Sequence, residues 1–176
     1  MTLEHLKRFR QDLYELLGKG ADATMDLMDA VLTTKSVQSF AELSLSPVFR
    51  RKWPSLYEAI EDVRPQRDEL MKLCINKIPD IQDKRIILAG DHTPWSRLYA
   101  ATLKDRTYQH GPKVISGDPI TLGYGYSTIA WIPEESGSWA LPLCHERITS
   151  FDNPLTKAAF QIKKVCCQLK VRPLTL

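Results

Sequence analysis

The sequence predicts a mixed fold, α+β or α/β, in which a helical N-terminal region of residues 1–80 precedes an α/β region of residues 81–176. Two observations support this prediction. Apolar residues recur at helical spacing through the first region, whereas short continuous apolar runs, which are typical of strands, begin after Pro79. A chain of 176 residues is long enough for one ordinary domain or two small ones.

The first region contains several predicted helices. Apolar side chains recur every three or four positions over 3–16, the glycines that follow predict the end of that helix, and a second helix covers about 22–32. Ser46 followed by Pro47 predicts another helix start, because serine caps a helix well and proline fits its first turn. An amphipathic stretch over 65–76 is the last helix expected in this region.

The second region is expected to alternate between strands and one helix. In order, we predict a buried strand ending at Asp91, a long ordered loop over 92–122, strands over 124–133 and 138–148, a helix from Asn153 to Leu169, and the start of a further strand over 171–176. Asn153 followed by Pro154 is a strong helix start. A linker is expected around 77–84.

Composition and charge narrow the function classes only broadly. Hydrophobic residues make up 43% of the chain and no apolar run reaches the roughly 18 residues of a membrane span, so we expect no membrane association. The N-terminus mixes charges into every turn, unlike a secretory signal, and a cytoplasmic location is expected. Residues 81–176 carry twelve basic and eight acidic residues, and this mild positive charge is compatible with nucleic acid without being evidence for it.

Asp91 is the main candidate for chemistry. It follows the apolar run that ends in Ala89 and Gly90, and a charged carboxylate at the end of a buried strand is costly unless something pairs with it. One interpretation is a ligand for a hard cation such as Mg²⁺, which prefers carboxylate oxygens. The other is a cap for the turn that His92 and Pro94 suggest, and composition alone favours this second interpretation.

Two basic clusters are candidate nucleic-acid contacts. Lys104 and Arg106 lie in the predicted loop among aromatic residues, where they could hold phosphates. Arg50, Arg51 and Lys52 precede a tryptophan at a predicted helix start and could contact a DNA backbone. In both cases a solvated surface is the competing interpretation.

Two further patterns carry little functional signal. His92, His110 and His145 match no compact zinc-binding motif. The Gly-Tyr-Gly-Tyr run at 123–126 matches no phosphate-binding loop, and close packing of the backbone at a strand start explains it better.

Three longer segments carry a resemblance. The runs AGDHTPWSRLYAATLKDRTYQHG, ITLGYGYSTIAWIPEESGSWALPLCHERI and NPLTKAAFQIKKVCCQLKVRPLTL resemble bacterial insertion-sequence transposases of the DDE type. The resemblance is closest over 85–176 and continues more weakly into LSLSPVFRRKWPSLYEAI. It implies a ribonuclease H-like domain in which three antiparallel strands are followed by a helix and a fourth strand.

The resemblance also implies a mechanism and partners. The family cleaves and joins DNA strands with divalent ions, Mg²⁺ or Mn²⁺, held by two aspartates and a glutamate, and Asp91 matches the first aspartate. The other two positions fall beyond Leu176, so we expect this chain to lack them and to be inactive alone, without a stably bound metal. DNA at transposon ends, full-length transposase or a second copy of the chain are the expected partners, in the bacterial nucleoid.

Two alternatives remain open. The chain could be a non-catalytic, transposon-derived DNA-binding or regulatory protein that uses its helical region. It could also be an unrelated helical interaction module joined to a small α/β domain.

Overall fold

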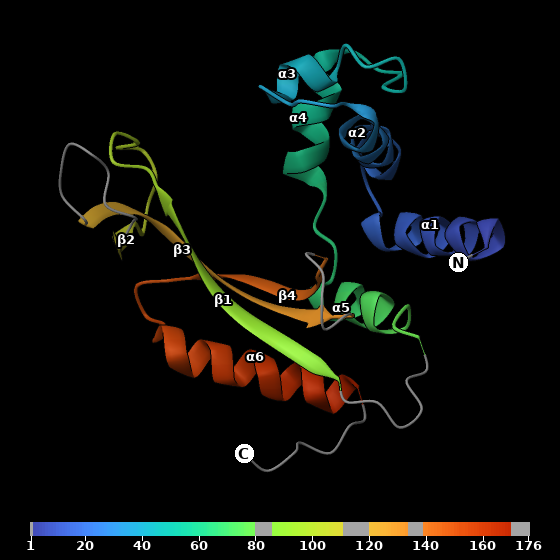
Figure 1. Ribbon diagram of the computed structural model, residues 1–176. Coiled ribbons are helices and arrows are strands. Elements are labelled where there is room, and N and C mark those ends of the chain that lie inside the picture. Colours follow the sequence, from blue (N-terminus) through green and yellow to red (C-terminus); the bar gives the residue numbers. More distant parts are fainter. Residues whose placement is uncertain (1, 80–85, 111–119, 134–138, 170–176) are drawn as a thin grey trace. The chain divides into compact units, whose positions relative to one another are not determined.

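The computed structural model describes residues 2–79, 86–110, 120–133 and 139–169. The chain divides into two compact units, Met1–Leu73 and Cys74–Leu176, so the division falls inside a helix (Figure 1). Each unit is described by itself.

The first unit is helical. Its helices are α1 (Leu3–Leu17), α2 (Ala21–Thr33), α3 (Phe40–Leu43), α4 (Trp53–Asp62) and α5 (Arg67–Ile75), the last of which reaches into the second unit. Thr2 caps α1 by accepting a hydrogen bond from the backbone N–H of His5. The predicted end of the first helix is confirmed, since α1 stops at Leu17 and Gly18 follows in a conformation with φ of 61°.

Two hydrophobic clusters hold this unit together. One joins α1, α2 and α5 through Leu13, Leu17, Ala21, Met25 and Leu73. The other joins α2, α3 and α4 through Leu27, Ala30, Leu43, Phe49 and Leu56. Because α2 contributes to both clusters, it is the central helix of the unit.

The helix start predicted at Ser46 and Pro47 is wrong. These residues lie in turns between α3 and α4, and the next helix begins at Trp53 with Pro54 in its first turn. The same physical preference, a proline whose missing N–H needs no partner in the first turn, is satisfied one proline later along the chain.

The second unit is an antiparallel sheet with one helix. Its elements are β1 (Ile87–Ser96), β2 (Thr107–His110), β3 (Ile120–Ile132), β4 (Leu141–Ile148) and α6 (Pro154–Gln168). The long strand β3 is central: it pairs with β1 along one edge and with β2 and β4 along the other. All three pairings are antiparallel, so the predicted fold class and the antiparallel order of the first three long strands are confirmed.

One face of this sheet is packed against α6 (Figure 1). Asn153 caps the helix, as predicted, by accepting hydrogen bonds from the backbone N–H groups of Leu155 and Thr156. Val165 of α6 and Ile129 of β3 are fully buried, which makes this layer the core of the unit.

Two predictions for the second region need correction. The segment 92–122 is not one long loop, because it contains the second half of β1, all of β2 and the start of β3. The strand that carries Asp91 is not buried on both faces: most of its residues are exposed, and among the described strands it pairs with β3 alone. The predicted strand at 171–176 and the residues between the predicted strands at 124–133 and 138–148 lie outside the described residues, as does most of the predicted linker.

In the described ranges, the helices are all too short or too polar to span a bilayer.

Candidate functional site

Asp91 lies in the middle of β1 with its side chain in solvent, and it accepts a hydrogen bond from the Thr93 hydroxyl at 3.2 Å. Directly opposed residues of an antiparallel pair share a face of the sheet. Asp91 is opposite Thr128 on β3, and Thr128 is opposite His145 on β4. The three side chains therefore form one row across the sheet, on the face that does not carry α6.

Two contacts of His145 order the row. The Thr128 hydroxyl and the His145 Nδ1 are 2.8 Å apart, within hydrogen-bond distance. The His145 ring also stacks on the Tyr126 ring, with centroids 5.0 Å apart and ring planes only 7° from parallel. These two contacts fix the orientation of the imidazole and leave its Nε2 as the nitrogen that can meet a ligand.

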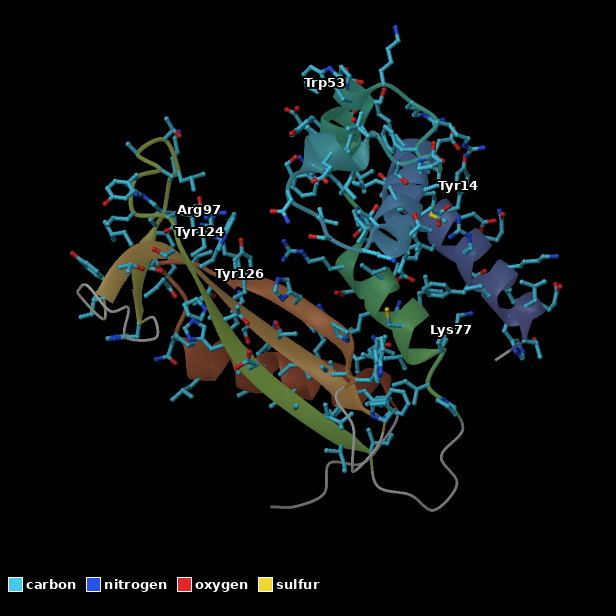
Figure 2. All side chains as sticks on the ribbon, turned by 45° about the horizontal axis from the view of Figure 1, so that its top comes forward. Tyr14, Trp53, Lys77, Arg97, Tyr124 and Tyr126 are labelled. Carbon is cyan, nitrogen blue, oxygen red and sulfur yellow. The ribbon has the colours of Figure 1, made fainter. Side chains whose placement is uncertain are left out.

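Three aromatic side chains continue the same face beyond Asp91. Trp95 is opposite Tyr124, and Tyr126 follows two residues later on β3, so all three rings share the Asp91 face. The Trp95 centroid lies 6.3 Å from that of Tyr124 and 6.4 Å from that of Tyr126. We call Trp95, Tyr124 and Tyr126 the aromatic platform; Figure 2 shows its two tyrosines beside Arg97.

Two guanidinium groups lie against the platform. The Arg97 guanidinium carbon is 3.5 Å from the centroid of Trp95, and that of Arg147 is 4.4 Å from the centroid of Tyr124. Arg147 is held in place by an ion pair with Asp105. Hydrogen bonds from Ser150, together with the Arg147 pair, keep the pKa of Asp105 below its usual value. The platform is thus bordered by oriented cations.

In the Gly-Tyr-Gly-Tyr run at 123–126, the two glycines lie on one face of β3 and the two tyrosines on the other. A Cβ at Gly123 would lie 2.0 Å from the backbone oxygen of Trp95, and one at Gly125 would lie 2.7 Å from His92 Nε2. The predicted close backbone packing is therefore confirmed at Gly123, whereas the atoms nearest a Cβ at Gly125 belong to side chains, and the run lies inside β3 instead of at its start. The tyrosines were missed as site residues, although their spacing of two in a strand could have placed both on one face.

The basic residues predicted between 92 and 122 have different surroundings. Arg106 donates to the backbone oxygens of Arg97 and Leu98, at 2.8 and 2.9 Å, so it braces the segment after β1. Lys104 is exposed, and its backbone oxygen accepts a hydrogen bond from the Tyr124 hydroxyl at 2.9 Å. Lys104 therefore stands at the border of the platform, whereas the Arg106 guanidinium is already occupied.

The other predicted basic cluster is also engaged within the protein. Arg50 and Arg51 both pair with Asp26, a buried carboxylate of α2, and Arg51 also reaches Asp22 at 3.3 Å. Burial alone would raise the pKa of Asp26, but the hydrogen bonds and charge of Arg50 and the charge of Arg51 lower it. Lys52 is exposed directly before α4. The two arginines therefore attach the segment before α4 to α2.

The donor atoms on this face determine whether it can hold divalent metal ions. Asp91 is the one carboxylate in the row, accompanied by hydroxyl groups and an imidazole. Across the described residues, no group of three or more His, Cys, Asp or Glu side chains is placed to hold a metal ion. The described residues thus offer one ligand and do not complete a site for two hard cations.

Comparison with protein families gives one match. The family described as DDE superfamily endonuclease matches residues 12–164, which is most of the chain and spans both units. No curated protein and no solved structure matches the chain.

Proposed function

Because the chain belongs to the DDE superfamily endonucleases, a transposase-like nuclease family, we propose that Asp91 is a metal-binding carboxylate of a DNA-cleaving site. The observation that carries this proposal is the row of exposed Asp91, half-buried Thr128 and exposed His145 on the face of the sheet that does not carry α6. A carboxylate in water-filled surroundings can take a hard cation without first losing a protein partner. The reaction proposed for the complete enzyme is strand cleavage and transfer in the transposition of an insertion sequence.

We further propose that this chain alone does not cut DNA. Divalent ions in such enzymes activate the attacking oxygen and stabilise the leaving one, which takes several carboxylates around the metals. In the row the described residues supply one carboxylate, Asp91, and the Asp105 carboxylate at the border of the platform is paired with Arg147, so additional carboxylates must complete the site. DNA is the proposed substrate, a full-length transposase or a second copy of the chain is the proposed source of those carboxylates, and the bacterial nucleoid is the proposed location.

The metal role of Asp91 can be tested without any activity. Fe²⁺ is added to the full chain in place of Mg²⁺, ascorbate and peroxide generate hydroxyl radicals at the bound ion, and mass spectrometry maps the backbone cuts. Because even weak and transient binding of Fe²⁺ produces radicals beside its ligand, we expect cuts near residues 91, 128 and 145 that excess Mg²⁺ suppresses. They should vanish in Asp91→Asn and persist in Glu58→Gln, a matched loss of an exposed acid on α4. Cuts that survive in Asp91→Asn would refute the assignment.

The inactivity of the isolated chain has its own test. A supercoiled plasmid is incubated with the purified chain and Mg²⁺ or Mn²⁺, and nicked product is measured on a gel. We expect no nicking above that of Asp91→Asn. Metal-dependent nicking that Asp91→Asn abolishes would show that the chain carries a complete site, contrary to the proposal.

A non-catalytic DNA-binding or regulatory role is the second candidate. The absence of a three-ligand group among the described residues favours it, as does an aromatic platform bordered by cations. The helical unit is a weaker basis for this role, since Arg50 and Arg51 are paired with acids of α2. DNA binding that persists unchanged in Asp91→Asn, together with no radical cuts near residue 91, would favour this candidate over the first.

A further inference from the structure

The aromatic platform places three large rings on the sheet face that does not carry α6. Trp95 is 42% exposed, and Tyr124 and Tyr126 are partly exposed, although large aromatic side chains gain most by burial. On the opposite face of the same strands, Ile129 and Ile148 are buried in the layer that packs with α6. One face of each ring is already covered, that of Trp95 by Arg97, that of Tyr124 by Arg147 and that of Tyr126 by His145. The parts of the rings that remain in solvent beside these cations form a surface of the kind that stacks planar ligands.

The arrangement of the rings selects the kind of nucleic acid. Trp95 is tilted by 44° to Tyr124 and by 54° to Tyr126, with centroids 6.3 and 6.4 Å apart, so the rings lie side by side and offer separate surfaces. Neighbouring bases in a duplex rise by about 3.4 Å, so each base covers the next. A base that stacks on one of these rings must expose its own face, which an internal base of a continuously stacked duplex does not do.

The charges around the platform suit a phosphate backbone. Arg97 lies over Trp95, and exposed Lys104 stands at the Tyr124 hydroxyl. Arg147, over Tyr124, is paired with Asp105, so Arg97 and Lys104 are the cations proposed to contact phosphate. An arginine stacked on a ring can keep this contact while its N–H groups bind a phosphate oxygen. The stacking groups and the phosphate partners are thus interleaved along one face.

We propose that the aromatic platform binds unpaired DNA bases, so that the strand beside Asp91 is single or locally melted. This inference deepens the proposed function, since it specifies the form of DNA that reaches the same face. Asp91 and Trp95 lie on the same face of β1, four residues or roughly 13 Å apart, and Tyr126 is opposite Thr93 between them, so a strand that extends along the platform toward Thr128 reaches the carboxylate. The platform supplies binding and position and does not itself touch the reacting phosphate.

Binding is measured by fluorescence anisotropy with the full chain and three labelled probes without added metal: a thymidine oligonucleotide, a hairpin duplex, and an abasic strand of equal length. We expect the thymidine strand to bind at least tenfold more tightly than the other two. Trp95→Leu and Tyr126→Leu should each weaken its binding about 5- to 100-fold and change abasic binding little, because each removes one stacking surface. Tyr126→Phe keeps the ring and should bind like the wild type.

Two controls separate stacking from general damage. Trp53→Phe alters an exposed ring of the helical unit and should leave binding unchanged. Arg97→Gln should lower the salt dependence of binding, whereas Trp95→Leu should not, since the arginine contributes a phosphate contact and the tryptophan a base contact. Equal affinity for thymidine and abasic strands would overturn the proposal.

A measurement on the unaltered chain covers the case in which a variant fails to fold. An oligonucleotide with 5-iodouracil is cross-linked by light, and the attached peptides are identified by mass spectrometry. Cross-links at Trp95, Tyr124 or Tyr126 are expected, and cross-links confined to the helical unit would overturn the proposal. The proposal would also be overturned if sedimentation showed that the chain self-associates and that an added thymidine strand neither binds the chain nor dissociates it. If Fe²⁺ produces no cuts that depend on Asp91 while oligonucleotide binding is intact, the metal-binding role of Asp91 is refuted and the proposal for the aromatic platform stands.

Discussion

The buried pair of Ser127 and Gln161 gives a quantitative test of how α6 is attached to the sheet. Ser127 on β3 is 3% exposed and Gln161 on α6 is 1% exposed. The Ser127 hydroxyl donates to Gln161 Oε1 at 2.5 Å, and Gln161 Nε2 donates back to the Ser127 backbone oxygen at 3.3 Å. Gln161→Leu keeps a side chain of similar size and removes both hydrogen bonds to Ser127, together with the weaker one that Gln161 Nε2 donates to Cys144 Sγ at 3.4 Å.

The expected losses follow from which polar groups stay behind. Gln161→Leu leaves a buried hydroxyl without this acceptor, which costs about 1–3 kcal/mol, and Ser127→Ala leaves the amide oxygen without its donor at a cost of about 1 kcal/mol. The double variant buries neither the hydroxyl nor the amide. Its loss should therefore be smaller than the sum of the single losses, by an interaction energy of about 1 kcal/mol or more.

Urea unfolding followed by tryptophan fluorescence measures these free energies. A Trp53→Phe background confines the signal to the second unit, because the three remaining tryptophans lie there. The three variants and their parent are compared in this background. Strictly additive losses, within about 0.5 kcal/mol, or a Gln161→Leu variant as stable as its parent, would refute the reasoning.

Three further predictions follow from single contacts. Asp26→Asn should destabilise the first unit by about 3 kcal/mol, measured by urea unfolding, because it breaks a buried ion pair. Folding lowers the pKa of Asp26, so the stability that its carboxylate contributes is complete above about pH 4 and is lost as the pH falls through the pKa of the folded state. Asp26→Asn should lack this pH dependence of stability, and a variant with the same dependence as the wild type would contradict the prediction. Hydrogen bonds from the backbone N–H and the hydroxyl of Thr149 lower the pKa of Asp152 to about 2. An NMR titration that gives a pKa near 4 for Asp152 would disprove this. Gly123→Ala should lower the melting temperature more than Gly125→Ala, because its new Cβ would overlap the Trp95 backbone and not only side-chain ends, and equal losses would count against this.

Local signals predicted much of the fold. The helical spacing and terminal glycine of α1 and the Asn153 cap of α6 depend on residues within a few positions of one another, and both predictions hold. β2 was missed because four residues, Thr107–His110, carry no usable alternation and form a strand only through their backbone pairing with β3. Such pairing depends on a distant segment, which no local pattern encodes.

The candidate site was predicted in part for the same reason. Arg50 and Arg51 look like DNA contacts in the sequence, but their partner Asp26 lies more than twenty residues away on α2. The rows across the sheet also combine residues from β1, β3 and β4, and only the register brings Thr128 and His145 beside Asp91. The sequence position of Asp91 was enough to identify it as a candidate, whereas its neighbours in the row could be identified only from the strand register.

The exposure of Asp91 changes the argument for its role and leads to a further prediction. A carboxylate in water pays no desolvation cost, so burial does not explain why an acid stands here. An acid beside a strand of phosphates is nevertheless unfavourable: two like charges about 5 Å apart repel by about 0.8 kcal/mol even at the dielectric constant of water. If the aromatic platform holds DNA, Asp91→Asn should therefore tighten binding of the thymidine strand about fourfold in chelator at low salt, and high salt should remove the gain. Glu58→Gln removes an exposed charge from the helical unit and should give no such gain. Unchanged binding in Asp91→Asn would place the DNA away from this carboxylate and remove the link between the platform and the proposed cleavage site.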